Sequence, residues 1–132
     1  MDKQKYLEKY FNDLRDIINF DSKKIKNLIA FSDILLKTNN LGKKTIIFGN
    51  GGSAAIANHA TTDLNKLRID DNCLSAISLS TNIPSLLAIG NDDGFKNIFI
   101  EQLKNYKPQK EDILIVRSKV AVESQPTELS SE

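Results

Sequence analysis

Apolar residues recur at helical spacing along the N-terminal third of the chain. The first stripe consists of Leu7, Tyr10, Phe11, Leu14, Ile17 and Ile18. Asp2 can cap its start. The second stripe consists of Ile25, Leu28, Ile29, Ile34, Leu35 and Leu36. It ends at Asn39, Asn40 and Gly42, residues that suit a left-handed helix cap. We predict an N-terminal helical hairpin over residues 1–42 that packs on the core and against a second copy of the chain; packing within one chain alone is the alternative.

Strand and helix patterns alternate from Thr45 onward. The strand candidates are residues 45–48, 74–79 and 112–116. Between the second and the third we predict a short helix opened by Thr81-Asn82-Ile83-Pro84 and a longer helix from about Gly94 to Tyr106. The buried stripe of the longer helix consists of Phe95, Ile98, Phe99 and Leu103. Strands that alternate with helices pair in parallel through right-handed crossovers, so the pattern predicts an α/β fold with a three-layer parallel sheet of about three strands.

A glycine-rich loop joins the first predicted strand to the helix after it. The loop consists of Gly49, Asn50, Gly51, Gly52 and Ser53. Glycines let a ligand approach the backbone, and the N–H groups at a helix start attract an anion with the help of the helix dipole. Ser53 adds a hydroxyl at the N-cap or in the first turn. The loop therefore predicts a phosphate site; the alternative is a glycine-rich turn without a ligand.

Two nucleotide-binding motifs match this loop only in part. It lacks the Gly-Lys-Ser/Thr ending of a P-loop, which argues against a nucleoside triphosphatase. Gly49, Gly51 and Ala54 fit the dinucleotide motif Gly-x-Gly-x-x-Ala, but that motif also needs an acidic residue at the end of the second strand. The second strand candidate is followed by Ser80, and its acidic neighbours, residues 70–71, precede it. A nicotinamide-dependent dehydrogenase is therefore the weaker alternative, and we expect no nucleotide cofactor.

The composition is that of one globular domain. Apolar residues make up 40% of the 132 positions, and no stretch resembles a membrane span or a signal peptide. Eighteen basic and seventeen acidic residues leave a net charge of +1, which gives no broad electrostatic case for binding nucleic acid or an anionic membrane. The single cysteine, Cys73, starts an apolar run, so we expect a core residue rather than a nucleophile. We expect a soluble, cytoplasmic protein.

Two titratable residues follow the loop on the same predicted helix. At about 100° per residue, the apolar stripe of this helix consists of Ile56, Ala60, Leu64 and Leu67. Asp63 falls within that stripe, and a carboxylate in a dry core would cost several kcal/mol, so Asp63 should face a cavity, a subunit junction or a partner charge. His59 lies four residues earlier on the same flank. The two side chains can share a metal or act as acid and base; a plain surface or structural pair is the alternative.

Two blocks of this sequence resemble one protein family. Residues 49–55, with His59 in the following helix, and residues 87–95 are similar in order and spacing to sugar isomerase (SIS) domain proteins of the phosphoheptose isomerase type. The resemblance runs from Met1 to about Val116 and implies a flavodoxin-like SIS fold whose N-terminal helices pack into a homotetramer. It implies an aldose–ketose isomerisation of sedoheptulose 7-phosphate to heptose 7-phosphate through an enediol. This is the first step of bacterial heptose synthesis for surface polysaccharides such as lipopolysaccharide or capsule.

The resemblance also implies roles for individual residues. The substrate-binding residues would be Asn50, Gly51, Gly52, Ser53 and Asp92. His59 matches a zinc-binding histidine of some members, and Asp63 stands where the family has a catalytic glutamate that moves a proton between C1 and C2. Asp63 and His59 are therefore the candidate catalytic residues and, together, the candidate zinc ligands.

Two departures from the family pattern bear on activity. Asp63 is one methylene shorter than glutamate, so its oxygens fall back by about 1.5 Å, enough to weaken a proton abstraction that needs contact at ~3 Å. The serine- and threonine-rich phosphate loop, the two further strands and the late helix with a catalytic histidine do not follow Val116, and His59 is the only histidine. We interpret residues 43–116 as a partial SIS domain and residues 117–132 as an unrelated polar tail, expected to be disordered, with a frameshift or premature stop as the hypothesis.

These departures leave two readings of the function open. The first is a truncated phosphoheptose isomerase that binds a sugar phosphate and is weak or inactive alone. The second is a non-catalytic sugar-phosphate-binding or regulatory SIS module, which forms a homo-oligomer or assembles with an intact paralogue.

Overall fold

A computed structural model describes residues 2–69 and 72–116 of the chain. The chain divides into two compact units, Met1–Ile34 and Leu35–Glu132. The tail predicted for residues 117–132 lies outside the described residues.

The first unit contains helix α1 (Lys3–Ile18) and most of helix α2 (Ser22–Asn40). Asp2 caps α1, as predicted, because its side chain accepts hydrogen bonds from two backbone N–H groups of the first turn. The apolar stripe of α1 is exposed throughout, from Leu14 at 40% to Ile17 at 69%. The two predicted helices are confirmed, whereas their packing as a hairpin and their role in oligomerisation stay predictions.

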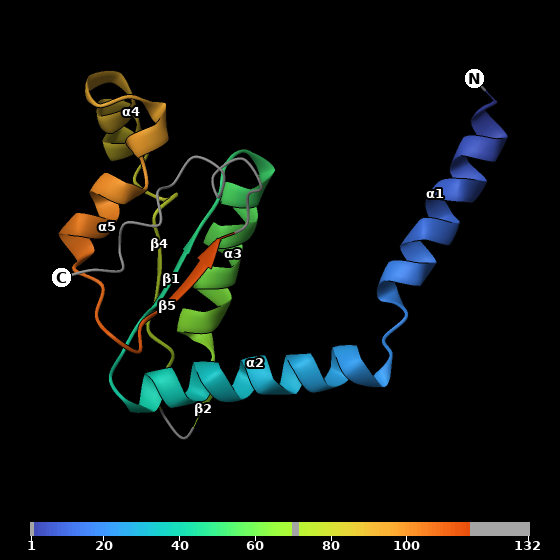
Figure 1. The fold of residues 1–132 in the computed structure, drawn as a ribbon, viewed down its shortest axis with the longest axis horizontal. Helices are drawn as coiled ribbons and strands as arrows, with labels where there is room; N and C mark the ends of the chain where they lie inside the picture. Colours follow the sequence, from blue (N-terminus) through green and yellow to red (C-terminus); the bar gives the residue numbers. More distant parts are fainter. Residues whose placement is uncertain (1, 70–71, 117–132) are drawn as a thin grey trace. The chain divides into compact units, whose positions relative to one another are not determined.

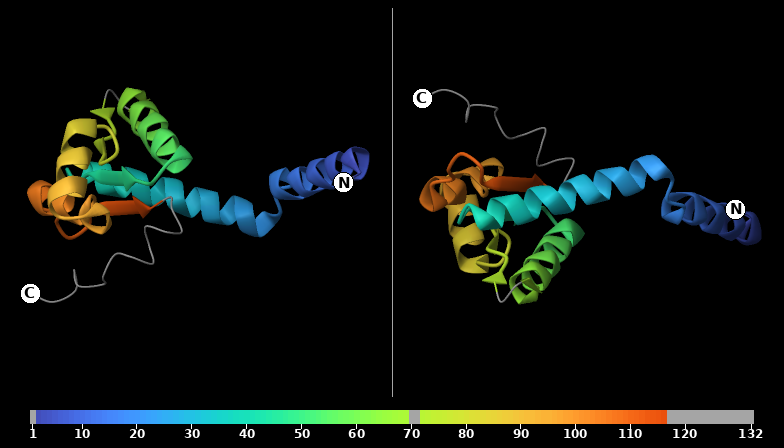
Figure 2. Two further views of the ribbon diagram at one scale, coloured as in Figure 1. Left: turned by 90° about the horizontal axis from the view of Figure 1, so that it is seen from above. Right: turned by 90° about the horizontal axis from the view of Figure 1, so that it is seen from below.

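A parallel sheet forms the centre of the second unit (Figures 1 and 2). Its strands are β1 (Thr45–Phe48), β4 (Ala76–Ser78) and β5 (Ile113–Val116), in the order β4-β1-β5. Thr45 at the start of β1 pairs with Ala76 on one side and with Ile113 on the other. The predicted parallel sheet of three strands is confirmed. All four residues of β1 are buried, as expected of a central strand in an α/β protein.

The second strand is shorter than predicted. Residues 74, 75 and 79 lie outside β4, although Ser75 O accepts the N–H of Thr45 and Leu79 N–H donates to Ile47 O. Asn72–Cys73 forms strand β3, which pairs antiparallel with strand β2 (Arg68–Ile69). The sequence gives little sign of this hairpin, because two-residue strands are too short to show an alternating pattern. The prediction that Cys73 belongs to the core is wrong: the residue is exposed, since it lies in this hairpin and not in the sheet.

Helices pack on both sides of the sheet (Figure 1). Helix α3 (Gly52–Lys66) contacts β1 and β4. On the other face lie helix α4 (Ile83–Asp92), the 3-10 turn η1 (Phe95–Asn97) and helix α5 (Ile100–Tyr106). Side chains of a strand alternate between faces, and the main core cluster lies on the α5 side. It consists of Ile46, Phe48, Leu79, Ile98, Phe99 and Leu103. The predicted three-layer α/β fold is therefore confirmed.

The long helix predicted from about Gly94 to Tyr106 is broken. Gly94 has φ 90°, which only glycine adopts without strain, and the chain passes through η1 before α5 begins. Ile98, Phe99 and Leu103 are buried as predicted. Phe95 is 65% exposed instead, because the 3-10 turn does not keep the helical stripe in phase.

A buried carboxylate ties the starts of β1 and β5 together. The side chain of Asp112 is 1% exposed and lies 2.8 Å from Lys44 Nζ. It also accepts the backbone N–H of Lys44 at 2.9 Å and that of Gln109 at 2.7 Å. Burial by itself raises the pKa of Asp112, but the hydrogen bonds from Gln109 and Lys44 outweigh it and hold this pKa below its ordinary value of 3.8.

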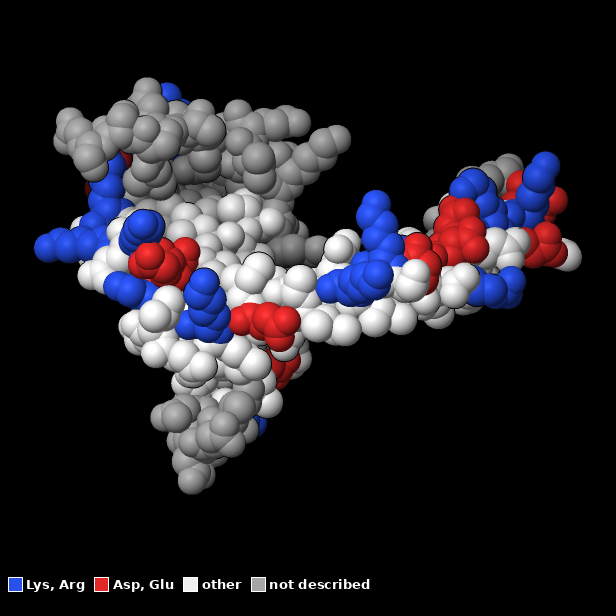
Figure 3. All heavy atoms as spheres, turned by 60° about the horizontal axis from the view of Figure 1, so that its bottom comes forward, with Lys and Arg blue, Asp and Glu red and all other residues white. Residues whose placement is uncertain are grey.

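Charge and hydropathy across the described residues agree with the composition. On the face that Figure 3 shows, basic and acidic side chains are interspersed and do not gather by sign. No helix in residues 2–69 and 72–116 combines the length and the apolar character that a membrane crossing needs.

Candidate functional site

The Gly49–Ser53 loop leaves the carboxyl end of β1 and opens α3. Gly51 is the N-cap of α3, with φ 53° and ψ −128°, a conformation that favours glycine. Two short backbone hydrogen bonds close the first turn, from Ser53 N–H to Asn50 O at 2.9 Å and from Ala54 N–H to Gly51 O at 3.0 Å. Within the described part of the chain, the amides of Gly51 and Gly52 have no hydrogen-bond partner. These are the N–H groups that a helix start offers to an anion.

The topology places this loop at the edge of the sheet where ligands bind in open α/β folds. The chain leaves β1 through α3 on one face and reaches β4, and it then returns through α4 and α5 on the other face to β5, on the far side of β1. The connections from neighbouring strands thus diverge at β1. Ligands bind outside the carboxyl ends of the strands at such a point.

A cleft of about 450 Å³ adjoins the loop. Its lining consists of Gly49, Asn50, Gly51, Ala54, Ser80, Ile83, Leu86, Leu87, Gly90, Asn91, Phe95, Ile98 and Phe99. The loop side offers backbone and small polar groups, whereas the side formed by α4 and η1 is mostly apolar. This combination is typical of a small-molecule site, in which a few polar groups fix the orientation of the ligand.

The cleft brings together only part of the predicted substrate-binding set. Asn50 and Gly51 line it, whereas Gly52, Ser53 and Asp92 are not among its lining residues. Asp92 is exposed at the end of α4 and accepts a hydrogen bond from Asn91 Nδ2 at 2.9 Å. The roles of these residues stay predictions.

Sequence reasoning missed Ser80 and Asn91 as cleft residues. Ser80 directly follows the predicted second strand, at the carboxyl edge of the sheet where ligand contacts are expected. Its position alone therefore indicates a candidate cleft residue. Asn91 belongs to the block of residues 87–95 that carries the family resemblance.

His59 and Asp63 form an exposed pair on α3. His59 Nε2 lies 3.3 Å from Asp63 Oδ2, and the side chains are 81% and 63% exposed. The pair is therefore free to meet a ligand or another chain. It offers two donor atoms, fewer than the three protein ligands that a catalytic zinc needs. In the described ranges, no three His, Cys, Asp or Glu side chains gather as a metal site, so zinc is not confirmed.

The apolar stripe predicted for α3 is not its buried face. Ile56 is 50% exposed and Leu67 48%, whereas Ala57 and Thr61 are buried against the sheet. Small side chains on this face let the helix axis approach β1 and β4 closely. Asp63 consequently does not enter the core, and of the stripe beside it Ile56 and Leu67 are exposed whereas Ala60 and Leu64 are half-buried.

A model of the SIS domain family matches residues 9–132. The chain belongs to this family. It is 38% identical over 96 residues to a phosphoheptose isomerase of Clostridium acetobutylicum, covering 72% of this chain and 48% of that protein. It is 37% identical over 105 residues to a probable phosphoheptose isomerase of Thermoplasma acidophilum, covering 79% and 54%. The chain thus spans about half the length of these curated relatives.

Solved structures of the SIS family agree with the fold. A phosphoheptose isomerase from Neisseria gonorrhoeae superposes with a TM-score of 0.70 at 25% identity, covering 92% of this chain and 67% of that one. One from Francisella tularensis gives a TM-score of 0.72 at 26% identity, covering 94% and 70%. The resemblance to SIS proteins of the phosphoheptose isomerase type is confirmed.

Proposed function

We propose that this SIS chain binds a sugar phosphate at the Gly49–Ser53 loop and takes part in the aldose–ketose isomerisation of sedoheptulose 7-phosphate. The observation that carries the proposal is the loop itself. It presents the amides of Gly51 and Gly52 at the start of α3, beside a cleft, in a chain similar to phosphoheptose isomerases. A dianionic phosphate is the group that such a helix start binds best.

The proposed chemistry is a proton transfer between neighbouring carbons. The carboxylate of Asp63 accepts a proton from C1 of the ketose, an enediol forms, and the proton returns to C2 of the aldose. His59, 3.3 Å from Asp63, assists proton movement at the sugar oxygens. Exclusion of water protects an enediol from side reactions, and Asp63 is 63% exposed in the single chain. We therefore propose that another chain or segment covers the pair during turnover.

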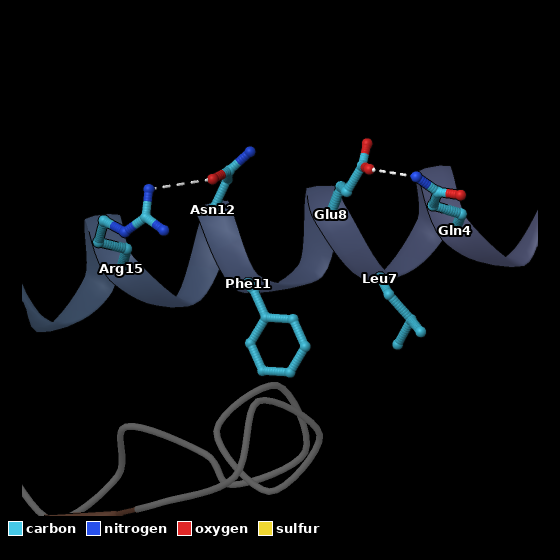
Figure 4. Close-up of a pocket in the computed structure, with 6 residues that line it drawn as sticks. All are labelled: Gln4, Leu7, Glu8, Phe11, Asn12 and Arg15. Atoms are coloured by element: carbon cyan, nitrogen blue, oxygen red, sulfur yellow. Dashed lines mark hydrogen bonds between the residues drawn. The ribbon is translucent and has the colours of Figure 1, made fainter.

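Assembly through the N-terminal helices is the proposed source of this cover. Figure 4 shows Leu7 and Phe11 projecting together from one side of α1, with polar side chains along the opposite side. The polar side is held by hydrogen bonds along the helix, from Gln4 to Glu8 and from Arg15 to Asn12. Such a two-sided helix with an exposed apolar stripe is typical of a helix that packs on a partner. We propose a homo-oligomer, a tetramer as in the family, or an assembly with an intact paralogue.

A non-catalytic binding module is the second candidate function. Two observations favour it: the shorter carboxylate at position 63, and the fact that His59 is the only histidine in the 132 residues. A two-histidine site cannot be built from these residues in one chain. In either case we propose a cytoplasmic role in heptose supply for lipopolysaccharide or capsule.

Substitutions of Gly52 test the phosphate site with little risk to the fold. A Cβ added at this residue meets no atom within 4 Å, so both Gly52→Ser and Gly52→Asp should fold. An aspartate at the helix start favours the helix but repels a phosphate. We expect calorimetry to show binding of sedoheptulose 7-phosphate by the wild type and by Gly52→Ser, and a loss of more than tenfold in Gly52→Asp.

Two results would refute the phosphate site. One is equal affinity of the wild type for sedoheptulose with and without its phosphate. The other is unchanged affinity in Gly52→Asp. Turnover measured on the same samples separates the two candidate functions, because a binding module binds the sugar phosphate and leaves it unchanged.

A further inference from the structure

A buried hydrogen-bond network lies directly beneath the Gly49–Ser53 loop. Ser80, which is 2% exposed, donates its hydroxyl hydrogen to the carbonyl of Gly49 at 3.1 Å. Its own N–H donates to Ser78 Oγ at 3.1 Å, and Ser78 Oγ donates to Asn58 Oδ1 at 2.6 Å. Asn58 Nδ2 closes the ring with a 3.4 Å contact to Ser80 O. The network joins the carboxyl end of β4, helix α3 and the first residue of the loop.

This arrangement fixes the loop from both of its ends. Ser80 holds Gly49, where the chain leaves β1, and Asn58 holds α3 six residues after its first residue, Gly52. The amides of Gly51 and Gly52 lie between these two anchors. A network whose polar groups are all paired rigidifies the backbone that it joins, and among the described side chains no buried N or O atom lacks a partner.

Ser80 lines the cleft, yet its hydroxyl is poorly placed to act as a phosphate ligand. A serine has one hydroxyl hydrogen, and the Gly49 carbonyl already accepts it. What remains on this oxygen are lone pairs, which do not attract an anion. The residue therefore contributes by holding the loop and not by direct contact with the phosphate.

We infer that Ser80, supported by Ser78 and Asn58, is a positioning residue that orients the amides of Gly51 and Gly52 toward an anion. The inference rests on the proposed phosphate site for its functional meaning. Its structural content, the dependence of the loop on Ser80, can be measured without any ligand.

The test compares Ser80→Ala with a matched control, Asn65→Ala. Asn65 also joins α3 to β4, because its side chain donates to Ala76 O at 3.0 Å and accepts from Ala76 N–H at 2.8 Å, away from the loop. Ser80→Ala loses the hydrogen bond to the Gly49 carbonyl, and Asn65→Ala loses the two to Ala76, so both should lower the melting temperature. Only Ser80→Ala should also change the loop.

Two readouts on the full chain follow the loop. The first is the chemical shift and the ¹⁵N order parameter of the Gly51 and Gly52 amides by NMR, and the second is the dissociation constant of sedoheptulose 7-phosphate by calorimetry. We expect Ser80→Ala to shift both amide resonances, to lower their order parameters and to weaken binding by about tenfold, the equivalent of ~1.4 kcal/mol. Asn65→Ala should leave both unchanged, and Ser80→Thr, which keeps the hydroxyl, should restore both.

The outcomes separate the inference from the proposed function. Wild-type chemical shifts and order parameters at Gly51 and Gly52 in Ser80→Ala would overturn the inference, as would equal effects of Asn65→Ala. If the loop amides respond but the wild type binds no sugar phosphate, the positioning role stands and the proposed function fails. Should Ser80→Ala not fold, Ser78→Ala removes the next hydroxyl of the network, and it must shift the same two amides.

Discussion

Replacement of Asp112 by asparagine probes the contact that aligns β1 with β5. The wild-type carboxylate accepts the N–H groups of Lys44 and Gln109 and pairs with the Lys44 ammonium, and its side chain is 1% exposed. Asparagine keeps one acceptor oxygen. Its NH₂ group replaces the other oxygen and must face the donors of Lys44 or Gln109. The substitution removes the buried negative charge and leaves two donors without an acceptor. We expect this to lower the free energy of unfolding by about 3 kcal/mol. At an m-value of about 1.5 kcal/mol/M, the urea midpoint should fall by about 2 M.

The pH dependence gives a second, independent check on Asp112. Its pKa in the folded chain lies below the ordinary value of 3.8, so the folded state favours the ionised carboxylate. The carboxylate therefore adds stability above pH 3.8, and this contribution is lost as pH falls through the lower folded pKa. The difference in free energy of unfolding between the wild type and Asp112→Asn should have its largest value at neutral pH and should become smaller in acid.

Urea unfolding followed by circular dichroism measures both effects. Asp93→Asn serves as the matched control, because Asp93 is an exposed aspartate at the end of α4. We expect the control to lie within about 0.5 kcal/mol of the wild type. An Asp112→Asn midpoint equal to that of the control, or a wild-type advantage that grows as pH falls, would refute the reasoning.

Three further predictions concern the site and the assembly. Gly51→Ala forces a Cβ onto φ 53° and should cost about 1–2 kcal/mol in urea unfolding; equal stability would contradict the N-cap geometry. Asp63→Ala should leave the melting temperature nearly unchanged, because the side chain is exposed, and should abolish any isomerase turnover; retained turnover would remove Asp63 from the mechanism. A Leu7→Ser, Phe11→Ser double variant should shift the mass measured by light scattering toward the monomer, whereas Gln4→Ser should not; an unchanged mass would exclude this face of α1.

Local sequence signals were sufficient for the elements that frame the site. The run Thr45 to Phe48 is a β-branched threonine followed by three apolar residues, which fits a strand buried on both faces, and β1 has these bounds. The residues 49–53 are glycine-rich between such a strand and a helix, and Gly51 takes the positive φ that this composition allows. Asp2 and Asn82 cap the helices that follow them, because capping depends only on residues within one turn.

Predictions failed where a residue's surroundings depend on distant segments. The stripe through Ile56 marks an apolar face of α3, but a stripe does not say whether the chain itself or a partner covers it. The face with Ala57 and Thr61 packs on the sheet instead. Cys73 looked like the start of a strand because the apolar run continues after it, yet pairing with Arg68 draws it into a separate hairpin.

The sequence by itself determined the order of the main helices and of the three sheet strands, the phosphate-type loop and membership of the SIS family, because each depends on residues close together in the chain. Only the tertiary structure decided that Ser80 reaches the carbonyl of Gly49, 31 residues away, and that α4 and η1 wall the cleft beside the loop. These contacts arise from the crossovers between parallel strands. They bring the carboxyl ends of β1 and β4 together at one edge of the sheet, and a linear pattern of apolar and polar residues does not encode such a meeting.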